Sequence, residues 1–296
     1  MNTIKIFRFL KNSNTHLKFI YISYKQIAIL ARRMIFSLRS YKHKLRLKLG
    51  LVKEEIHFYS HPDYNGTNLD KWINDGIKGY RQWYQPINFG NINAHVTTPP
   101  NWKPDPSLDY DYGLGRWNSI ITRNLPEVAN KRILDVGCNV GLYSIELAKM
   151  GASEVIGIDR NLDFNHKSNF PPKQDIISQA RFVKKALELK SGTTYPVRYY
   201  GINFNDYEKL RALGRFDFIL ALNVTYHEYK DSTFFIKTLS EMTDQLVLQI
   251  SVGHGYPLSK WANIPKHVEM LVNCDFTKIE IDCPVGYMNP MIIAKR

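Results

Sequence analysis

The sequence predicts an α/β fold with a doubly wound, mostly parallel sheet. From about residue 131 onward, short aliphatic runs alternate with stretches of helical periodicity. A glycine-containing turn joins the first run to the first helix, and an acidic residue ends the second run. Strands that alternate with helices form parallel sheets, because each helix crosses one face of the sheet to reach the next strand. We therefore expect five parallel strands, extended by an antiparallel hairpin at the sheet edge to seven in all.

Each element can be placed from its composition. The strands are β-branched or aliphatic runs, expected at 132–136, 154–159, 197–203, 216–222 and 245–251. Helical periodicity predicts helices at 140–150, 174–189, 206–213, 232–243 and 264–273. The last two apolar segments, FTKIEID and PMIIAKR, flank a turn of Cys, Pro and Gly. They are expected to pair as the edge hairpin, which ordinary dinucleotide-binding sheets lack.

Charge and composition divide the chain into three regions. Residues 1–53 contain 13 Lys and Arg and no acidic residue, whereas the rest of the chain contains 27 basic and 27 acidic residues. We interpret 1–53 as a basic amphipathic helical extension, 54–125 as an aromatic, Pro-rich cap or lid, and 126–296 as the domain that carries the chemistry. Because the chain after residue 53 is neutral on balance, the high overall charge does not by itself predict nucleic-acid binding.

The chain is expected in the cytoplasm, with attachment to the inner face of the membrane through 1–53 as an added hypothesis. The apolar stretch 27–38 is interrupted by Arg32 and Arg33 and is shorter than the roughly 20 residues of a membrane span. Basic residues recur through the region, which disfavours a secretory signal. The three cysteines and the scattered histidines lack ligand spacing, so neither a disulfide framework nor a metal site is expected.

The main cofactor signal is the block RILDVGCNVGLYSIELAKMGASEVIGIDR at 132–160. Gly137 and Gly141 permit positive φ and close backbone approach, and the helix that follows offers N–H groups to a cofactor. Asp159 ends the second strand, 22 residues after Gly137, where a carboxylate can accept both hydroxyls of a ribose. The strand, the glycine turn and the acidic residue together predict a site for an adenosine-containing cofactor.

The turn favours S-adenosylmethionine over a dinucleotide. It reads Asp135-Val-Gly137-Cys-Asn139-Val-Gly141, which resembles the D-x-G-x-G-x-G motif of class I methyltransferases more than G-x-G-x-x-G. Asn139 replaces the middle glycine, and asparagine tolerates left-handed backbone better than most residues. Asp135 would lie near the amino group of the cofactor. The alternatives are a dinucleotide domain and a cofactor-free α/β domain.

From about Trp83 to Arg296 the chain resembles the tRNA wobble 5-carboxymethoxyuridine and 5-methoxyuridine methyltransferases and their relatives, within the Rossmann-like class I methyltransferases. The matching pieces are WYQPINFG at 83–90, GRW at 115–117, the 132–160 block, GINFND at 201–206 and FDFILALNVTYHEYKD at 216–231. The resemblance implies that Gly137 and Asp159 bind the cofactor, with carboxy-S-adenosylmethionine as the alternative donor. It places Ile202 and Asn203 beside the adenine, Leu222 and Tyr226 at the methionine end, and Arg116 or Trp117 near the site of a cofactor carboxylate.

Tyr226 and His227 follow the fourth strand, at the sheet edge where ligands bind. A histidine there can accept a proton from an acceptor hydroxyl because its pKa lies close to neutrality; the alternative is a role in orienting the loop. The cap aromatics Tyr80, Trp83, Tyr84 and Trp102 can stack on a base or sugar, or they can pack the lid on the sheet.

Three functions remain in competition. The preferred one is O-methylation of a small molecule, glycan or lipid-linked intermediate near an anionic membrane surface, which residues 1–53 would contact. The second is a tRNA methyltransferase in which that segment binds phosphates. The third is a non-catalytic protein that binds S-adenosylmethionine, and the intact Asp135, Gly137, Gly141 and Asp159 argue against it.

Overall fold

The computed structural model describes residues 59–80, 82–98, 103–160, 175–225, 232–250, 263–283 and 289–296. Residues 1–53 and the predicted catalytic pair Tyr226 and His227 lie outside these ranges. Within the described ranges, none of the helices has both the length and the apolar composition needed to cross a bilayer.

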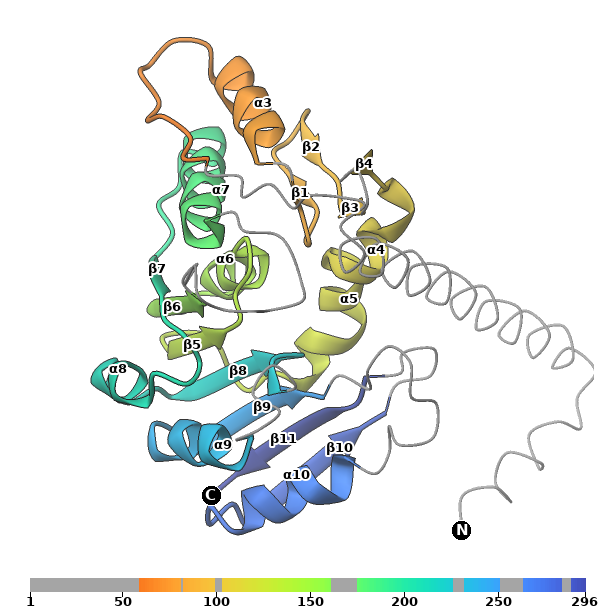
Figure 1. Ribbon diagram of the computed structural model, residues 1–296, viewed down its shortest axis with the longest axis vertical. Helices are drawn as coiled ribbons and strands as arrows, with labels where there is room; N and C mark the ends of the chain where they lie inside the picture. Colours follow the sequence, from red (N-terminus) through yellow and green to blue (C-terminus); the bar gives the residue numbers. More distant parts are fainter. Residues whose placement is uncertain are drawn as a thin grey trace, which may run out of the picture.

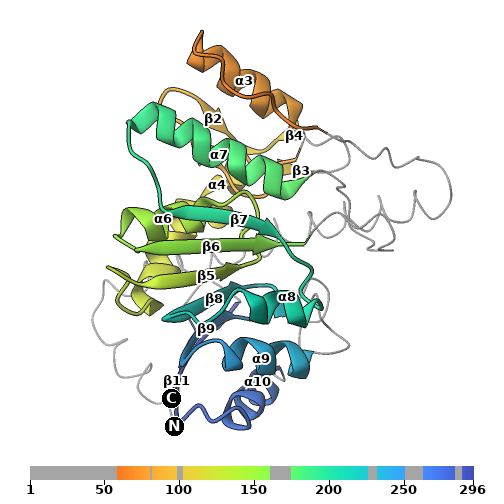
Figure 2. The ribbon, with the colours of Figure 1, turned by 90° about the vertical axis from the view of Figure 1, so that its left-hand side faces the viewer.

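A seven-stranded sheet forms the centre of the molecule, in the order β10-β11-β9-β8-β5-β6-β7 (Figures 1 and 2). Strands β5 to β9 are mutually parallel, and β10 and β11 join them antiparallel at one edge. The strands are β5 Arg132–Val136, β6 Glu154–Asp159, β7 Val197–Gly201, β8 Phe218–Leu222, β9 Gln245–Gln249, β10 Lys278–Asp282 and β11 Met291–Lys295. The chain order reverses at β5, whose neighbours are β6 and β8, and ligands of doubly wound sheets bind beyond the carboxyl ends of the strands at such a switch point.

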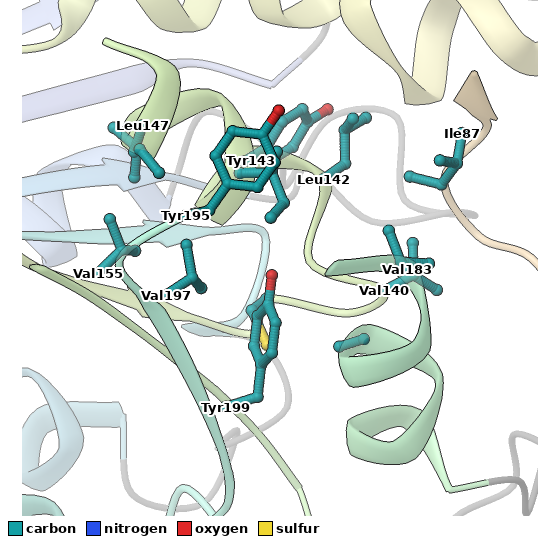
Figure 3. Packing of buried hydrophobic residues seen from close by; sticks show 14 of the residues in the cluster. Ile87, Val140, Leu142, Tyr143, Leu147, Val155, Val183, Tyr195, Val197 and Tyr199 are labelled. Atoms are coloured by element: carbon teal, nitrogen blue, oxygen red, sulfur yellow. The ribbon is translucent and has the colours of Figure 1, made fainter. Parts of the chain in front are cut away.

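Helices cover both faces of the sheet, and each face has its own buried cluster. The first cluster packs under α6 Leu142–Lys149 and α7 Ile176–Ser191. In Figure 3, Val197 and Tyr199 project from β7 toward the side on which Leu142 and Tyr143 of α6 lie. The second cluster packs under α8 Tyr207–Ala212, α9 Ser232–Glu241 and α10 Asn263–Val272.

The region before β5 forms a cap over the α6 and α7 face. Its elements are short: α3 Leu69–Gly79, β1 Ile87–Asn88, β2 Asn93–Ala94, β3 Thr97–Thr98, β4 Lys103–Pro104, η2 Pro106–Leu108, α4 Asp109–Tyr112, α5 Leu114–Arg116, η3 Trp117–Ile121 and η4 Thr122–Asn124. Tyr80 and Trp83 are buried and belong to the same cluster as α6 and α7. These two aromatics pack the cap on the domain, and their rings are not exposed for stacking.

The predicted fold class is confirmed, including the antiparallel edge strands. Strands β5 and β6 have the predicted bounds. Strand β7 ends two residues early at Gly201, because Gly201 pairs with Asp159, the last residue of the neighbouring strand β6, and no strand residue is left to pair beyond it. Strand β8 begins two residues late, because Phe216 forms only an isolated bridge to Thr243.

Candidate functional site

The turn between β5 and α6 is a left-handed loop tied to the neighbouring strand. Gly137, Asn139 and Gly141 have φ of +78°, +52° and +85°. Asn139 thus adopts the conformation for which asparagine substitutes for glycine at least cost. The N–H groups of Gly137 and Cys138 donate to the Ile158 carbonyl over 2.8 and 3.0 Å, so the turn is fixed to β6 at the switch point.

Both glycines are required by neighbouring side chains as well as by φ. A Cβ on Gly137 would lie 2.1 Å from Cγ1 of Val224, and a Cβ on Gly141 would lie 2.2 Å from the hydroxyl of Tyr199. The same hydroxyl donates to the Gly141 carbonyl over 3.2 Å. Besides leaving space for a cofactor, the two glycines therefore allow Val224 and Tyr199 to pack directly against the turn.

Asp159 is positioned as expected of a ribose ligand. Its carboxylate is 8% exposed at the end of β6, where Oδ2 accepts from the Asn139 N–H and Oδ1 from the Arg160 N–H, at 2.9 and 2.8 Å. No other described residue bonds these oxygens, so each keeps a second lone pair for a hydroxyl. Burial raises the pKa of Asp159, and the two backbone donors and the Arg160 charge oppose that rise.

Asp135 lies deeper, 2% exposed, and caps the first turn of α6. Its carboxylate accepts from the Ser144 hydroxyl over 2.6 Å and from the Ser144 backbone N–H. The Leu142 N–H of the same turn donates to the Gln85 side chain of the cap over 3.4 Å. The expectation that this helix offers its free N–H groups to a cofactor is therefore corrected for Leu142 and Ser144, whose N–H groups bind protein acceptors.

The residues expected around the adenine and the methionine end lie along the edge formed by the carboxyl ends of the parallel strands, where Asp159 also lies. Ile202 is buried, and its N–H bonds the Asp159 carbonyl over 2.8 Å, which joins the two loops. Asn203 is half-buried beside it, and its carbonyl accepts from the Asp206 N–H at the start of α8. Leu222 ends β8 and packs against the first buried cluster. These residues and the Gly137 turn thus flank the switch point.

Arg116 and Trp117 bring the cap to this edge. The Trp117 ring is buried and stacks on Tyr143 of α6, with centroids 5.3 Å apart and planes 16° apart. The Arg116 guanidinium lies 5.9 Å from the centroid of the Tyr143 ring and donates to Oε1 of Gln249, the last residue of β9. Among the described residues, no carboxylate is hydrogen-bonded or ion-paired to Arg116.

An amide network supports Arg116 at the ends of β8 and β9. Gln249, 1% exposed, accepts from the Asn223 amide over 3.2 Å and donates to the Asn289 carbonyl over 3.2 Å. The Asn289 amide donates to Oδ1 of Asn223 over 3.0 Å. Sequence reasoning missed Asn223 and Gln249, and the available signal was a polar residue directly after, or at the end of, an otherwise apolar strand.

Metal ligation finds no support within the described part of the chain, where no group of three His, Cys, Asp or Glu side chains is placed to hold an ion. Cys138 is buried within the glycine turn, Cys274 is half-buried and Cys283 is exposed.

The residues present fit S-adenosylmethionine. The carboxylate of Asp159 stands at the end of β6, where each oxygen accepts one hydrogen bond from the described residues, next to a left-handed turn at the switch point. The antiparallel strands β10 and β11 extend the sheet. The fold and the site together define a Rossmann-like class I methyltransferase domain.

Comparisons with known proteins agree with this class. Residues 110–249 match a family model described as a methyltransferase domain. A tRNA U34 carboxymethyltransferase of Shewanella amazonensis is 23% identical over 230 residues, which cover 73% of this chain and 61% of that protein. A protein of the same name from Alteromonas mediterranea is 22% identical over 193 residues, covering 64% and 50%. The chain therefore spans about half to three-fifths of the length of these curated relatives.

Among solved structures, the N-terminal domain of EvdMO1, crystallised in the presence of S-adenosylhomocysteine and D-fucose, has a TM-score of 0.52 at 14% identity. The match covers 79% of this chain and 99% of that domain. This likeness concerns the fold. The chain contains a class I S-adenosylmethionine-dependent methyltransferase domain and is a distant homologue of the tRNA U34 carboxymethyltransferases.

Proposed function

We propose that the protein is an S-adenosylmethionine-dependent O-methyltransferase whose acceptor is a small molecule, a glycan or a lipid-linked intermediate. The observation that carries the cofactor assignment is Asp159, which is buried at the end of β6 and tied to the left-handed turn through Asn139. Each of its carboxylate oxygens accepts one backbone hydrogen bond from the described residues, which leaves a lone pair for a ribose hydroxyl. Two observations support the acceptor class: the even balance of charges after residue 53 and the acid-free basic segment before it.

The proposed roles follow the order of the site along the sheet edge. Asp159 binds the ribose hydroxyls, Ile202 and Asn203 flank the adenine, and Leu222 and Tyr226 line the methionine end. The cofactor supplies an activated methyl group on a sulfonium. The protein's task is to align the acceptor hydroxyl with that methyl and to exclude water. Holding the two reacting groups in line lowers the activation free energy of methyl transfer by several kcal/mol.

The cofactor assignment is tested by calorimetry with S-adenosylmethionine and S-adenosylhomocysteine. Asp159→Ala should weaken both by roughly 1.5 to 3 kcal/mol, because charge-assisted hydrogen bonds to the ribose are lost. Asp63→Ala, at an exposed carboxylate in the cap, is the matched control and should change neither. Unchanged affinity in a folded Asp159→Ala variant would remove Asp159 from the site.

We infer from its position five residues after β8 that His227 accepts the proton of the acceptor hydroxyl. His227→Asn should lower the methylation rate by about 10²-fold or more and leave cofactor affinity unchanged, since a general base acts on the chemical step. Equal losses of rate and cofactor affinity would instead mark His227 as a structural residue.

A second candidate function is methyl or carboxymethyl transfer to the wobble uridine of tRNA. The names of the curated relatives favour it. Arg116 favours it as well: among the described residues it is hydrogen-bonded to the neutral amide of Gln249 and to no carboxylate, so its charge can bind a carboxylate on the donor. A third candidate function is binding of S-adenosylmethionine without turnover. Calorimetry would then show cofactor binding, but the protein would transfer no methyl group to any acceptor.

A further inference from the structure

The cap contains a histidine–carboxylate pair that lies outside the cofactor turn. His95 follows β2, and Asp109 begins α4. Nδ1 of His95 lies 2.6 Å from Oδ2 of Asp109, and Oδ1 of Asp109 accepts the Val96 N–H over 3.0 Å. The carboxylate is thus held from two sides, while the side chain of His95 remains 34% exposed.

The pair fixes which ring nitrogen of His95 can bind a ligand. A carboxylate only accepts hydrogen bonds, so Nδ1 carries the proton that faces Asp109. In the neutral imidazole the lone pair then lies on Nε2. Within the described part of the chain, no residue is hydrogen-bonded to Nε2 of His95. His95 therefore presents an oriented hydrogen-bond acceptor to a donor group such as a hydroxyl.

The pair belongs to segments of the cap that contact the first turn of α6. The histidine lies in a segment that runs antiparallel to residues 83–87. Gln85 of that facing segment accepts the N–H of Leu142, next to the glycine turn, over 3.4 Å. Helix α4 ends at Tyr112, whose carbonyl accepts from the Tyr143 hydroxyl of α6 over 3.3 Å. Figure 1 shows α4 and α5 at the end of the sheet where β8 and β9 finish.

An exposed aromatic ring follows the pair in sequence. Tyr110 is 63% exposed, and its ring packs on Gly115, where a Cβ would lie 2.4 Å from Cδ2 of Tyr110. One side of the ring is thereby supported, and most of the ring stays open. Gly115 precedes Arg116, whose guanidinium is hydrogen-bonded to Gln249 at the end of β9. The open ring therefore lies on the segment of the cap that reaches the carboxyl edge of the sheet.

A hydrogen-bond acceptor and an open aromatic ring on neighbouring residues fit a sugar. A pyranose has a face of C–H groups, which packs on an aromatic ring, and a rim of hydroxyls, which donate to oriented acceptors. We propose that the cap surface of His95, Asp109 and Tyr110 binds the methyl acceptor, and that this acceptor is a sugar. Tyr110 packs on the C–H face, and Nε2 of His95 accepts from a hydroxyl next to the one that is methylated. The inference rests on the proposed function and selects the glycan among its three acceptor classes.

The test is NMR of the full chain with isotope-labelled histidine, saturated with S-adenosylhomocysteine and titrated with the methyl glycosides of D-fucose, D-galactose and D-mannose. The signal of His95 is assigned by its loss in His95→Gln. At least one glycoside should shift the Nε2 signal of His95 with a saturating dependence on concentration. Cyclohexanol, which has a ring of similar size and a single hydroxyl, should bind about tenfold more weakly or worse. A His95 signal that none of the three glycosides shifts would overturn the inference.

Asp109→Asn tests the orientation of the pair with little change in shape. The Val96 N–H keeps the oxygen of the amide, so the NH2 group faces Nδ1 of His95. Nδ1 must then accept, and the proton moves to Nε2, which the NMR signals of the two nitrogens report. Glycoside affinity should fall about tenfold, because the hydroxyl loses its acceptor. Asp70→Asn, at a cap carboxylate paired with Lys190, is the matched control and should change neither the tautomer nor the affinity.

The aromatic ring is tested separately. Tyr110→Ala should weaken the same glycoside about tenfold, whereas Tyr200→Ala, at a partly exposed ring of the edge strand β7, should not. Affinity for S-adenosylhomocysteine should stay unchanged in both variants, which reports an intact domain.

A pair that only stabilises the cap gives a different result. Asp109→Asn would then lower the free energy of unfolding while glycoside affinity stayed the same, and the inference would be wrong. If Asp109→Asn does not fold, Tyr110→Ala and the wild-type titration decide. A wild type that does not bind S-adenosylhomocysteine would instead refute the proposed function, and the glycoside titration without cofactor would still test the cap surface.

Discussion

At the scale of single residues, Arg116 distinguishes the two candidate donors. Its guanidinium is held against Tyr143 and bonded to the amide oxygen of Gln249, and no described carboxylate neutralises it. For the preferred function we expect the wild type to bind S-adenosylmethionine at least as tightly as its carboxylated form. Arg116→Ala should then change the affinity for S-adenosylmethionine by less than about threefold, because no charge on that donor needs the guanidinium.

The control is Arg123→Ala, seven residues further along the cap, where the guanidinium is already paired with Asp282 at 2.6 Å. Competition calorimetry with both donors measures the difference. A wild type that prefers the carboxylated donor, and loses that preference in Arg116→Ala but not in Arg123→Ala, would promote the tRNA candidate.

At the scale of elements, α6 joins the cofactor turn to the cap. Trp117 is buried against Tyr143 of its first turn, and the Tyr143 hydroxyl donates to the Tyr112 carbonyl over 3.3 Å. Trp117→Ala should lower the free energy of unfolding by about 3 to 5 kcal/mol, as expected for a large buried ring whose cavity cannot collapse fully. Urea denaturation measures it, with Tyr110→Ala as control, since that cap ring is 63% exposed. Equal small losses in both variants would show that the stack does not anchor the cap.

The same scale shows what sequence patterns can and cannot predict. Strands β5 and β6 were predicted within their bounds because both faces of the sheet are covered, which leaves continuous apolar runs. The glycine turn was predicted because left-handed backbone restricts residue choice. The contact of Arg116 with Gln249 joins residues 133 apart in sequence, and the burial of Asp135 depends on α6 packing over it. Such features follow from tertiary packing, which no local pattern contains.

At the scale of the whole molecule, charge separates the two acceptor classes. All of the +13 net charge belongs to residues 1–53, a segment the structure does not describe. If this segment contacts a membrane surface, the full-length protein should co-sediment with anionic vesicles, and a variant lacking residues 1–53 should not. Each Lys or Arg near such a surface contributes about 1 kcal/mol, so half of the thirteen suffice for attachment. Cofactor calorimetry on the shortened variant is the control, and its affinity should be unchanged.

The salt dependence of that attachment decides what the segment binds. Apolar residues among the basic ones, such as Ile27, Leu30 and Met34, should make part of the vesicle binding survive high salt, because hydrocarbon burial is not screened. Binding to RNA phosphates releases counterions. For an RNA-binding segment, the logarithm of the binding constant would therefore fall steeply and linearly with the logarithm of the salt concentration. We therefore expect sedimentation with anionic vesicles to fall to a plateau above zero as salt rises. Binding to tRNA with a wobble-uridine preference, a steep salt slope and no binding to vesicles would reverse the assignment, and make the segment an RNA-binding arm of a tRNA methyltransferase.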